Sequence, residues 1–389
     1  MSAHSETKPD TSPFDTEERR SFRDSVAKLI ASDIAPHLEA WDEAGEVPWE
    51  LHAKVGALGI FGLGIDDAYG GLGFDDCFMR AAYSEEFGKA AAGGVWAALG
   101  GRVISLDPIQ SLASEAIRQR VLPDVIAGRK GSSLAITEPS GGSDVARLKT
   151  RAKKDGNHYV LNGSKTFITG GMTSDYFVVG ARTGGEGLGG ISLFFVPADA
   201  PGFARSAIER KMGWWASDTA TLYFDQCRVP AENLMGEENK GFLAIMANFN
   251  LERVSLTAIA LGHMKACLEE AIAWAQTRET FGQKLITHQV IRHKIADMSA
   301  RIDACEAWLN QICWQVVQGE MPVAQIAKSK FYTTKALEFC ASEAMQILGG
   351  AGYLRGQRVE RIYRDTKVLA IGGGSEEVMR DLAVRQMGL

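Results

Sequence analysis

Hydroxyl groups, two adjacent glycines and an acid are packed into one short stretch, LAITEPSGGSDVARLKT, which runs from Leu134 to Thr150. Gly141 and Gly142 have no Cβ, so the backbone there can approach a ligand closely and present several N–H groups to a planar polar molecule. The same composition also suits an ordinary polar turn after a strand. The residue types therefore indicate either a cofactor-binding turn or a plain turn.

A second candidate for chemistry is Glu252 in NFNLERVSL. If this stretch is helical, the side chains three and four positions away share its face, and none of them is a cation. These neighbours are Asn248, Phe249, Ser255 and Leu256. Poor solvation raises the pKa of a carboxyl group above its reference value of about 4.3, which is the direction that a general base needs. The alternative is an inert glutamate beside Arg253, whereas Glu269 is expected to form a solvated pair with Lys265.

Two further acids follow three glycines in IGGGSEEVM, from Ile371 to Met379. Ser375 is a preferred residue type for a helix N-cap, which would put Glu376 and Glu377 in the first helical turn, where the dipole favours negative charge. Glu376 also has Arg380 four residues on. We therefore expect a structural or cofactor-contacting role for both acids rather than a catalytic one.

Three stretches of different sequence pattern must position these residues. Residues 1–130 show mainly helical periodicity, as in FRDSVAKLIASDIAPHLEAW. Residues 131–240 contain short alternating or β-branched runs such as DYFVVGAR and GISLFFVPA, bounded by Gly, Pro or Asp. Residues 241–389 return to long helical patterns, as in RVSLTAIALGHMKACLEEAIAWAQ. This order predicts a mainly α protein of the α+β class, with a central β domain between two helical domains.

The composition excludes several classes of protein. With 389 residues, a net charge of -6 and a pI near 5.8, the chain has no basic footprint for nucleic acid. The longest apolar run, from Ala90 to Gly101, is too short to span a membrane. The first twenty residues mix acids with bases and lack an apolar core, so we expect an irregular start rather than a targeting signal. The six cysteines form no CxxC pair and the seven histidines have no metal-ligand spacing, so we expect a cytoplasmic protein without a metal site.

Several motifs together resemble those of the acyl-CoA dehydrogenase family, in the order that the family has them. They are YGGLG (69–73), TEPSGGSD (137–144), NGSKTFITGG (162–171), KMGWWASDTATLYFDQCRVP (211–230), TRETFGQKLITHQ (277–289) and QILGGAGY (346–353). The resemblance covers nearly the whole chain. It implies an N-terminal helical domain, a central β-barrel or sandwich domain and a C-terminal four-helix bundle. It also implies FAD bound across a subunit interface, in a homo-oligomer that is usually a tetramer.

The resemblance places FAD-binding residues in two groups. In the first group, five residues would face the flavin and three would cover its other edge, with the Thr169 hydroxyl near N5; they are Ala135, Ile136, Thr137, Gly142 and Ser143, then Phe167, Ile168 and Thr169. The family usually has tryptophan at the Phe167 position, so this chain keeps the aromatic face and loses the indole donor.

The second group would come from a neighbouring subunit. Arg278 would bind the FAD diphosphate with its permanently charged fork, although a cation that complements the dipole at a helix end is the alternative. Phe281, Gln289 and the backbone of Gln346, Ile347, Leu348, Gly349 and Gly350 would complete this second group. Further cofactor contacts, outside the two groups, are expected at Ser375, Glu376 and Glu377.

Dehydrogenation of an acyl-CoA removes a proton next to the thioester and a hydride from the following carbon, so it needs a carboxylate opposite the flavin. In many members of the family the base lies in a segment resembling YEGTSE, which aligns with 372–377 and puts Gly373 where the glutamate would be. Long-chain and isovaleryl members carry their base at the position of Glu252, which is therefore the expected base. The Gly373 N–H would polarise the thioester oxygen. The expected substrate-binding residues are Ser143, Leu243, Phe249, Asn250, Leu251, Arg253, Gly373 and Gly374.

The resemblance thus predicts an FAD-dependent acyl-CoA dehydrogenase that forms a trans-2-enoyl-CoA and passes electrons to an electron-transfer flavoprotein. The position of the base favours a branched or longer acyl chain. An oxidase that uses O2 and an inactive flavin-binding scaffold subunit are the alternatives, and a carrier-protein thioester in place of CoA stays open.

Overall fold

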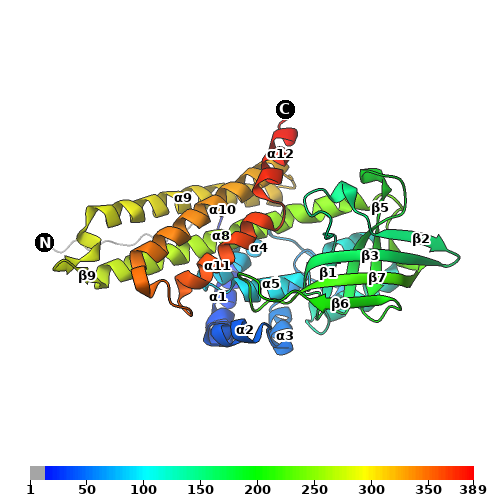
Figure 1. Ribbon diagram of the computed structural model, residues 1–389, viewed down its shortest axis with the longest axis horizontal. Helices are drawn as coiled ribbons and strands as arrows, with labels where there is room; N and C mark the ends of the chain where they lie inside the picture. The colour runs from blue at the N-terminus through cyan, green and yellow to red at the C-terminus, as the bar shows by residue number, and fades with distance from the viewer. Residues whose placement is uncertain (1–13) are drawn as a thin grey trace.

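The computed structural model describes residues 14–389, which form an elongated molecule with long helices at one end and a β domain at the other (Figure 1). Helices precede and follow the β domain in the chain, so the predicted order of the three parts is confirmed. The expectation of an irregular start falls mostly on residues 1–13, which lie outside the described residues.

The N-terminal part consists of short helices whose starts agree with the sequence. Thr16 caps the first helix by accepting a hydrogen bond from the Arg19 N–H, and Asp76 caps the fourth by accepting from two backbone N–H groups. The helices are α1 (Glu17–Leu29), α2 (Leu38–Ala44), α3 (Trp49–Ala57), α4 (Cys77–Lys89), α5 (Gly93–Gly101), α6 (Leu106–Leu112) and α7 (Glu115–Ile126).

The β domain is one mixed sheet with the strand order β6-β7-β3-β2-β4-β5-β8, in which β1 pairs parallel with β4. The strands are β1 (Ser132–Ala135), β2 (Arg151–Asp155), β3 (His158–Thr169), β4 (Tyr176–Arg182), β5 (Ile191–Pro197), β6 (Phe203–Ala207), β7 (Thr219–Pro230) and β8 (Leu234–Met235). The antiparallel ladder of β3 and β7 is interrupted between Lys165 and Ile168. Such a bulge turns a side chain out of the regular alternation, and Phe167 within it has φ +57.

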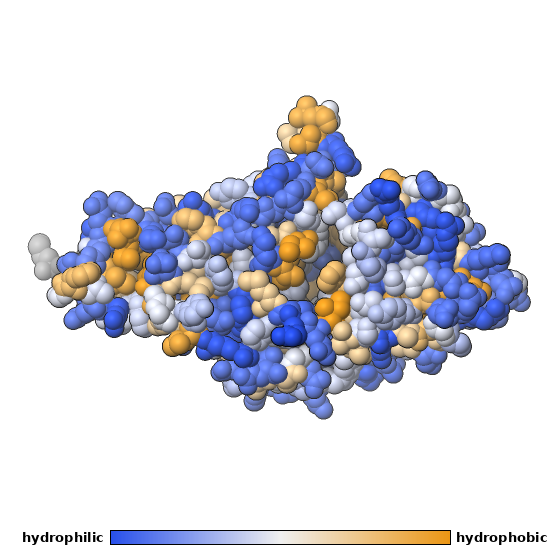
Figure 2. All heavy atoms as spheres, viewed as in Figure 1, coloured by the Kyte–Doolittle hydropathy of each residue, from blue (hydrophilic) through white to orange (hydrophobic). Residues whose placement is uncertain are grey.

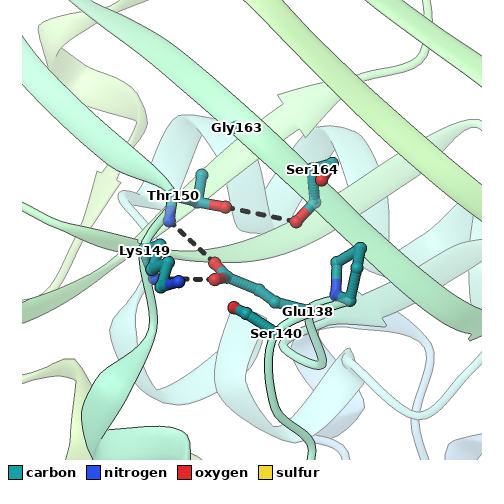
Figure 3. A pocket seen from close by; sticks show the side chains of 7 residues that line it. Glu138, Ser140, Lys149, Thr150, Gly163 and Ser164 are labelled. Carbon is teal, nitrogen blue, oxygen red and sulfur yellow. Dashed lines mark hydrogen bonds between the residues drawn. The ribbon is translucent and has the colours of Figure 1, made fainter.

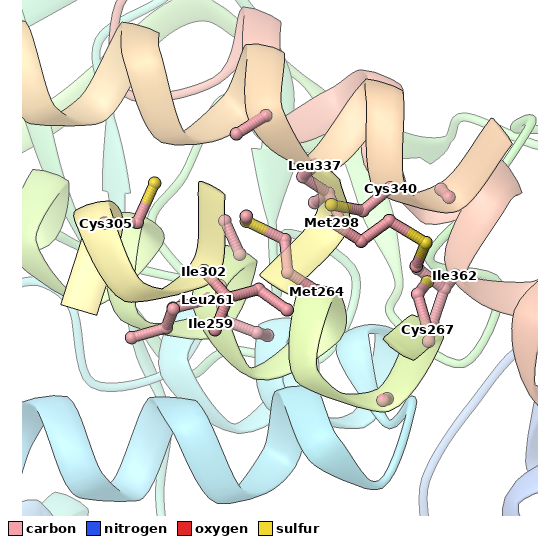
Figure 4. Close-up of a cluster of buried hydrophobic side chains, with 14 of the residues drawn as sticks. Ile259, Leu261, Met264, Cys267, Met298, Ile302, Cys305, Leu337, Cys340 and Ile362 are labelled. Carbon is pink, nitrogen blue, oxygen red and sulfur yellow. The ribbon is translucent and has the colours of Figure 1, made fainter. Parts of the chain in front are cut away.

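The C-terminal part contains the long helices. They are α8 (Gly241–Thr277), α9 (Gln289–Val317), α10 (Val323–Leu348), α11 (Arg358–Ile371) and α12 (Glu376–Gln386), with a small hairpin of β9 (Glu279–Thr280) and β10 (Gln283–Lys284) after α8. Met264, Met298, Leu337 and Ile362, one each from α8, α9, α10 and α11, meet in a buried apolar cluster (Figure 4). Four helices therefore share one core, as the family resemblance implied.

The position of α8 is fixed by a close crossing with α4. A Cβ on Gly262 would lie 2.1 Å from the Glu85 carbonyl oxygen, and one on Gly88 would lie 2.4 Å from the Ile259 carbonyl oxygen, so only glycine allows the two backbones to approach this closely. Near the start of α8, the Asn248 side chain donates to the Ile104 carbonyl at 3.3 Å. The N-terminal part thus holds α8 at two points. Across residues 14–389, the helices are either too short or too polar to cross a membrane.

Candidate active site

The two sequence stretches predicted to bind a flavin lie together. The Thr166 N–H donates to the Thr137 carbonyl at 2.9 Å, and the Ser133 hydroxyl donates to the Thr169 carbonyl at 2.9 Å. The turn that follows β1 therefore lies beside the end of β3. Ala135 and Ile136 are buried, Thr137 is half-buried, and Gly142 and Ser143 are exposed. The exposed part of the turn is the part whose backbone the sequence predicted to face a ligand.

Glu138 holds this turn from inside the sheet (Figure 3). Its carboxylate accepts hydrogen bonds from the backbone N–H of Lys149 at 2.6 Å and of Thr150 at 2.8 Å. It also pairs with the buried Lys165 ammonium at 2.9 Å. Burial tends to raise the pKa of Glu138, but the lysine and the two N–H groups outweigh it and the pKa is lowered. Sequence reasoning missed both residues of this pair. The available signal was an acid, Glu138, in the TEPSGGSD stretch and a lysine, Lys165, in the NGSKTFITGG stretch.

The bulge of β3 presents an aromatic ring beside this turn. Phe167 is 67 % exposed, whereas Ile168 is buried and Thr169 is half-buried. Helix α5 approaches Thr169 closely, since a Cβ on Gly101 would lie 2.5 Å from the Thr169 Cγ2. An exposed aromatic ring next to exposed hydroxyl and N–H groups fits a planar, partly polar ring such as a flavin.

Glu252 lies on α8, one helical turn after the residue that anchors this helix to the N-terminal part. Its Oε2 is buried and has no hydrogen-bond partner among the described residues. Burial raises the pKa of Glu252 to about 7, although Arg253 and Lys330 act in the opposite direction. An unpaired carboxyl group with such a pKa is suited to accept a proton near neutral pH.

The glycines of IGGGSEEVM lie beside this carboxyl group. A Cβ on Gly373 would be 3.9 Å from the Glu252 Oε1 and 2.4 Å from the Leu256 Cδ1. Gly373 and Gly374 have φ +65 and +106, which other residue types rarely adopt. A side chain at position 373 would therefore occupy the space next to the Glu252 carboxyl group.

Two buried cations bind the carbonyl groups of these glycines. Arg253 Nε donates to the Gly373 carbonyl at 3.0 Å, and Lys330 Nζ, from α10, donates to the Gly374 carbonyl at 2.6 Å. Sequence reasoning missed Lys330. The available signal was a lysine on the apolar face of a helix, three and four positions from Ala327 and Ile326.

Other predicted substrate residues belong to the first turns of α8 itself. Asn250 is buried and accepts a hydrogen bond from Arg253 Nη1 at 3.1 Å, and the Phe249 ring lies 5.8 Å from the guanidinium carbon of the same arginine. Leu251 is half-buried, whereas Leu243 is 75 % exposed. The face of the molecule is hollowed between the C-terminal helices and the β domain (Figure 2).

The helix cap and the ion pair that the sequence predicted after the glycines are both present. Ser375 caps α12 by accepting from the Val378 N–H, and Glu376 pairs with Arg380 at 3.5 Å and with Lys335 at 3.3 Å. At the N-terminus of α12, the backbone N–H and the Ser375 hydroxyl lower the pKa of Glu377. Glu376 is buried, and its Oε1 forms no hydrogen bond, but two cations pair with its carboxylate, whereas Glu377 is exposed.

The predicted pair of Lys265 with Glu269 is wrong. Lys265 instead pairs with Glu85 of α4 at 2.9 Å and with Glu306 of α9 at 2.5 Å, and Glu269 pairs with Arg358 at 2.7 Å. Carboxylates on α4 and α9 bind Lys265, and Arg358 of α11 binds Glu269, so partners on other helices replace the weak pairing along one helix.

The second predicted cofactor group lies far from the first within this chain. Arg278 follows the last residue of α8, so it is separated from Glu252 by about 39 Å of helix at a rise of roughly 1.5 Å per residue. Phe281 has φ +52 and is 99 % exposed, and Gln289 begins α9. Gln346, Ile347 and Leu348 end α10, followed by Gly349 and Gly350. The hairpin after α8 lies at the end of the molecule opposite to the β domain (Figure 1). One chain therefore cannot bring both groups around one cofactor.

Comparison with known sequences identifies the family of this chain. Three successive parts of the chain match the acyl-CoA dehydrogenase N-terminal domain (residues 16–129), middle domain (133–227) and C-terminal domain (239–388). The chain belongs to the acyl-CoA dehydrogenase family.

Individual relatives in this family match over almost their full length. The cyclohexane-1-carbonyl-CoA dehydrogenase of Geobacter metallireducens is 33% identical and aligns over 96% of this chain and 98% of its own. The mitochondrial isovaleryl-CoA dehydrogenase of Pongo abelii is 34% identical over 94% of this chain and 87% of its own. The solved structure of an acyl-CoA dehydrogenase from Geobacillus kaustophilus superposes with a TM-score of 0.93 at 33% identity, covering 97% of this chain and 100% of the other.

Proposed function

We propose that this chain is an FAD-dependent acyl-CoA dehydrogenase in which Glu252 removes the proton next to the thioester. The observation that carries the proposal is the Glu252 carboxyl group beside a corner of glycines, with its Oε2 buried and without a hydrogen-bond partner among the described residues. Family membership supplies the class of reaction, and this carboxyl group supplies the base that the glycine at position 373 cannot. The product would be a trans-2-enoyl-CoA.

Glu252 and Gly373 would have separate roles in the reaction. The Glu252 carboxylate takes the α-proton, and its raised pKa of about 7 makes it a stronger base than an exposed glutamate. The N–H of Gly373 donates to the thioester oxygen and stabilises the negative charge that develops there when the proton leaves. Bound FAD would supply the acceptor for the hydride from the β-carbon.

The flavin would be held by residues of two subunits. The turn of Thr137, Gly142 and Ser143 would contact one side of the ring system, with Phe167 and Thr169 at its other edge. Arg278 and Phe281 are exposed and too distant to join them within one chain, so another copy would supply them for the diphosphate. This requirement supports a homo-oligomer, for which we propose a tetramer. An electron-transfer flavoprotein as acceptor and a cytoplasmic location also belong to this proposal.

A branched or cyclic acyl chain is the substrate class that we propose. The base lies on α8 rather than in the glycine corner, as the sequence resemblance implied for long-chain and isovaleryl members. Relatives at 33% and 34% identity act on cyclohexane-1-carbonyl-CoA and isovaleryl-CoA by name, and both acyl groups are branched near the thioester.

The test is the bleaching of the flavin absorbance by acyl-CoA without oxygen, with Glu252→Gln compared with Glu269→Gln. Glu269 lies on the same helix, is exposed and pairs with Arg358, so its variant controls for the loss of one charge from α8. We expect the first variant to keep FAD and bind acyl-CoA without bleaching, and the second to bleach like the wild type. A panel of straight, branched and cyclic acyl-CoAs would then define the substrate.

Three results would overturn parts of the proposal. Bleaching of Glu252→Gln at the wild-type rate would exclude this base. Oxygen consumption without an added acceptor would favour an oxidase, and a wild-type flavin that no acyl-CoA bleaches would favour a scaffold subunit.

A further inference from the structure

Lys330 is a fully buried lysine whose ammonium group reaches the glycine corner. It lies in the first half of α10, it is 0 % exposed, and its Nζ donates to the Gly374 carbonyl at 2.6 Å. Burial lowers the pKa of Lys330 to about 8, and the neighbouring Arg253 adds to this effect. Keeping a cation at such a place costs free energy of folding, so its presence calls for a role other than packing.

Arg253 provides the second contact to the same corner. Only 5 % of this residue is exposed, its Nε binds the Gly373 carbonyl, and its Nη1 binds the Asn250 side chain. Two cations from different helices, α8 and α10, therefore hold two successive carbonyl groups. Charge-assisted hydrogen bonds of this kind are shorter and stronger than those between neutral groups.

The corner needs such support because its backbone is unusual. Gly373 and Gly374 both have positive φ values, and a glycine restricts its own φ and ψ less than any other residue does. The two bonds fix the peptide planes that join Gly373 to Gly374 and Gly374 to Ser375, so they hold the backbone immediately after the Gly373 N–H. Within residues 14–389 the Gly373 N–H has no hydrogen-bond acceptor, so it stays free to bind a ligand.

The carbonyl groups also keep the cations from pairing with the base. Among the described residues, neither Arg253 nor Lys330 forms an ion pair with Glu252, although both lower its pKa from a distance. A direct pair would stabilise the carboxylate and make it a weaker base. Because the two cations are turned to backbone oxygens, Glu252 keeps its raised pKa.

We propose that Lys330 is a positioning residue: its bond to the Gly374 carbonyl holds the glycine corner in the shape that presents the Gly373 N–H to the substrate oxygen. This inference rests on the proposed function, because it assigns a use to that N–H. The charged groups that face Lys330 are Glu252 and Arg253 from α8 and Glu376 and Glu377 from α12.

The experiment compares Lys330→Met with Lys367→Met in the FAD-loaded protein. Lys367 is exposed, lies on α11 and pairs with Glu338, so its variant controls for the same change of charge and side chain. Two ligands separate the roles: acetoacetyl-CoA, which binds as an enolate and gives a long-wavelength band with an oxidised flavin, and an S-alkyl-CoA thioether, which has no carbonyl oxygen.

We expect Lys330→Met to keep FAD, to bind the thioether like the wild type, and to bind the acetoacetyl-CoA enolate on the order of tenfold more weakly, as for a partial loss of oxyanion stabilisation. Flavin reduction by acyl-CoA should slow by a similar factor. Removing the charge of Lys330 also raises the pKa of Glu252, so the increase of the reduction rate with pH should move to higher pH. Lys367→Met should match the wild type in every measurement.

The inference is overturned if Lys330→Met binds the enolate and reduces its flavin like the wild type. It is also overturned if affinity for the thioether falls as much as affinity for the enolate, which would show a purely structural role. If Lys330→Met does not fold, Lys330→Gln gives the same comparison with a polar side chain too short to reach Gly374. A wild-type protein that forms no enolate band and is not bleached would instead refute the proposed function, and this inference with it.

Discussion

Replacing Glu252 with glutamine should remove the proposed base and also remove a loss of stability that the wild type shows as the pH rises to neutral. Burial raises the pKa of this carboxyl group from the ordinary value of 4.5 to about 7. An acid with a raised pKa binds its proton more tightly in the folded protein than in the unfolded chain. The free energy of unfolding therefore falls as the pH rises from below 4.5 through about 7, and levels off above that range.

The size of this effect follows from the two pKa values. The difference between 4.5 and about 7 corresponds to about 3 kcal/mol, at roughly 1.4 kcal/mol per pKa unit. Unfolding of 389 residues has an entropy of about 0.8 kcal/mol/K, from roughly 2.1 cal/mol/K per residue. The melting temperature of the wild type should thus lose about 4 °C relative to the glutamine variant, mostly between pH 5 and pH 7.

The assay is thermal unfolding of the FAD-saturated proteins between pH 5 and pH 8.5, followed by circular dichroism. Burying the glutamine amide lowers the free energy of unfolding, but by an amount that does not depend on pH. The quantity to compare is therefore how the difference in melting temperature between the wild type and Glu252→Gln changes with pH. Glu269→Gln should run parallel to the wild type, because the carboxyl group it removes is exposed. If the curves of the wild type and Glu252→Gln also run parallel, the Glu252 pKa is not raised and the argument for this base fails.

Three further predictions concern the cofactor turn, the subunit interface and the glycine corner. Lys165→Met should lower the free energy of unfolding in urea by about 3 to 5 kcal/mol, because it leaves Glu138 as a buried charge without a cation. Adding Glu138→Gln should recover part of this loss, and a Lys165→Met variant as stable as the wild type would contradict the pairing. Arg278→Ala should weaken FAD binding at least about tenfold in a fluorescence titration, with unchanged helix content, and unchanged affinity would exclude its role at the diphosphate. Adding Gly373→Glu to Glu252→Gln should restore flavin reduction only weakly, because the backbone φ of +65 at this position and the nearby Leu256 side chain disfavour a glutamate there. Adding Leu256→Ala as well should raise the restored rate, and equal rates with and without this change would contradict the steric explanation.

Local sequence patterns were sufficient where neighbouring residues in the chain decide the structure. The helix cap at Ser375 and the pair of Glu376 with Arg380 span four residues or fewer, so the sequence predicted both. The order of helical and β parts also follows from periodicity, because the spacing of apolar residues differs between helices and strands. The absence of a cation from the helix face of Glu252 was visible in the same way.

The electrostatic surroundings of the candidate base depended on contacts between helices. Lys265 pairs with carboxylates on α4 and α9 instead of Glu269, and Lys330 of α10 binds a carbonyl of the glycine corner. The spacing of residues along α8 could indicate neither contact. Long side chains on different helices meet only when those helices pack, and the packing here depends on the close crossing of α4 and α8.

The sequence by itself determined the family and the order of the elements, and it led to the prediction of Glu252 rather than the acids after the glycines as the base, because these inferences depend on motifs and on helix periodicity. Only the tertiary structure decided that Oε2 of Glu252 is buried without a partner among the described residues, and that Arg253 and Lys330 bind the glycine carbonyls instead of this carboxyl group. The physical reason is that burial and charge act through space. A pKa depends on every group within a few ångströms, wherever that group lies in the chain.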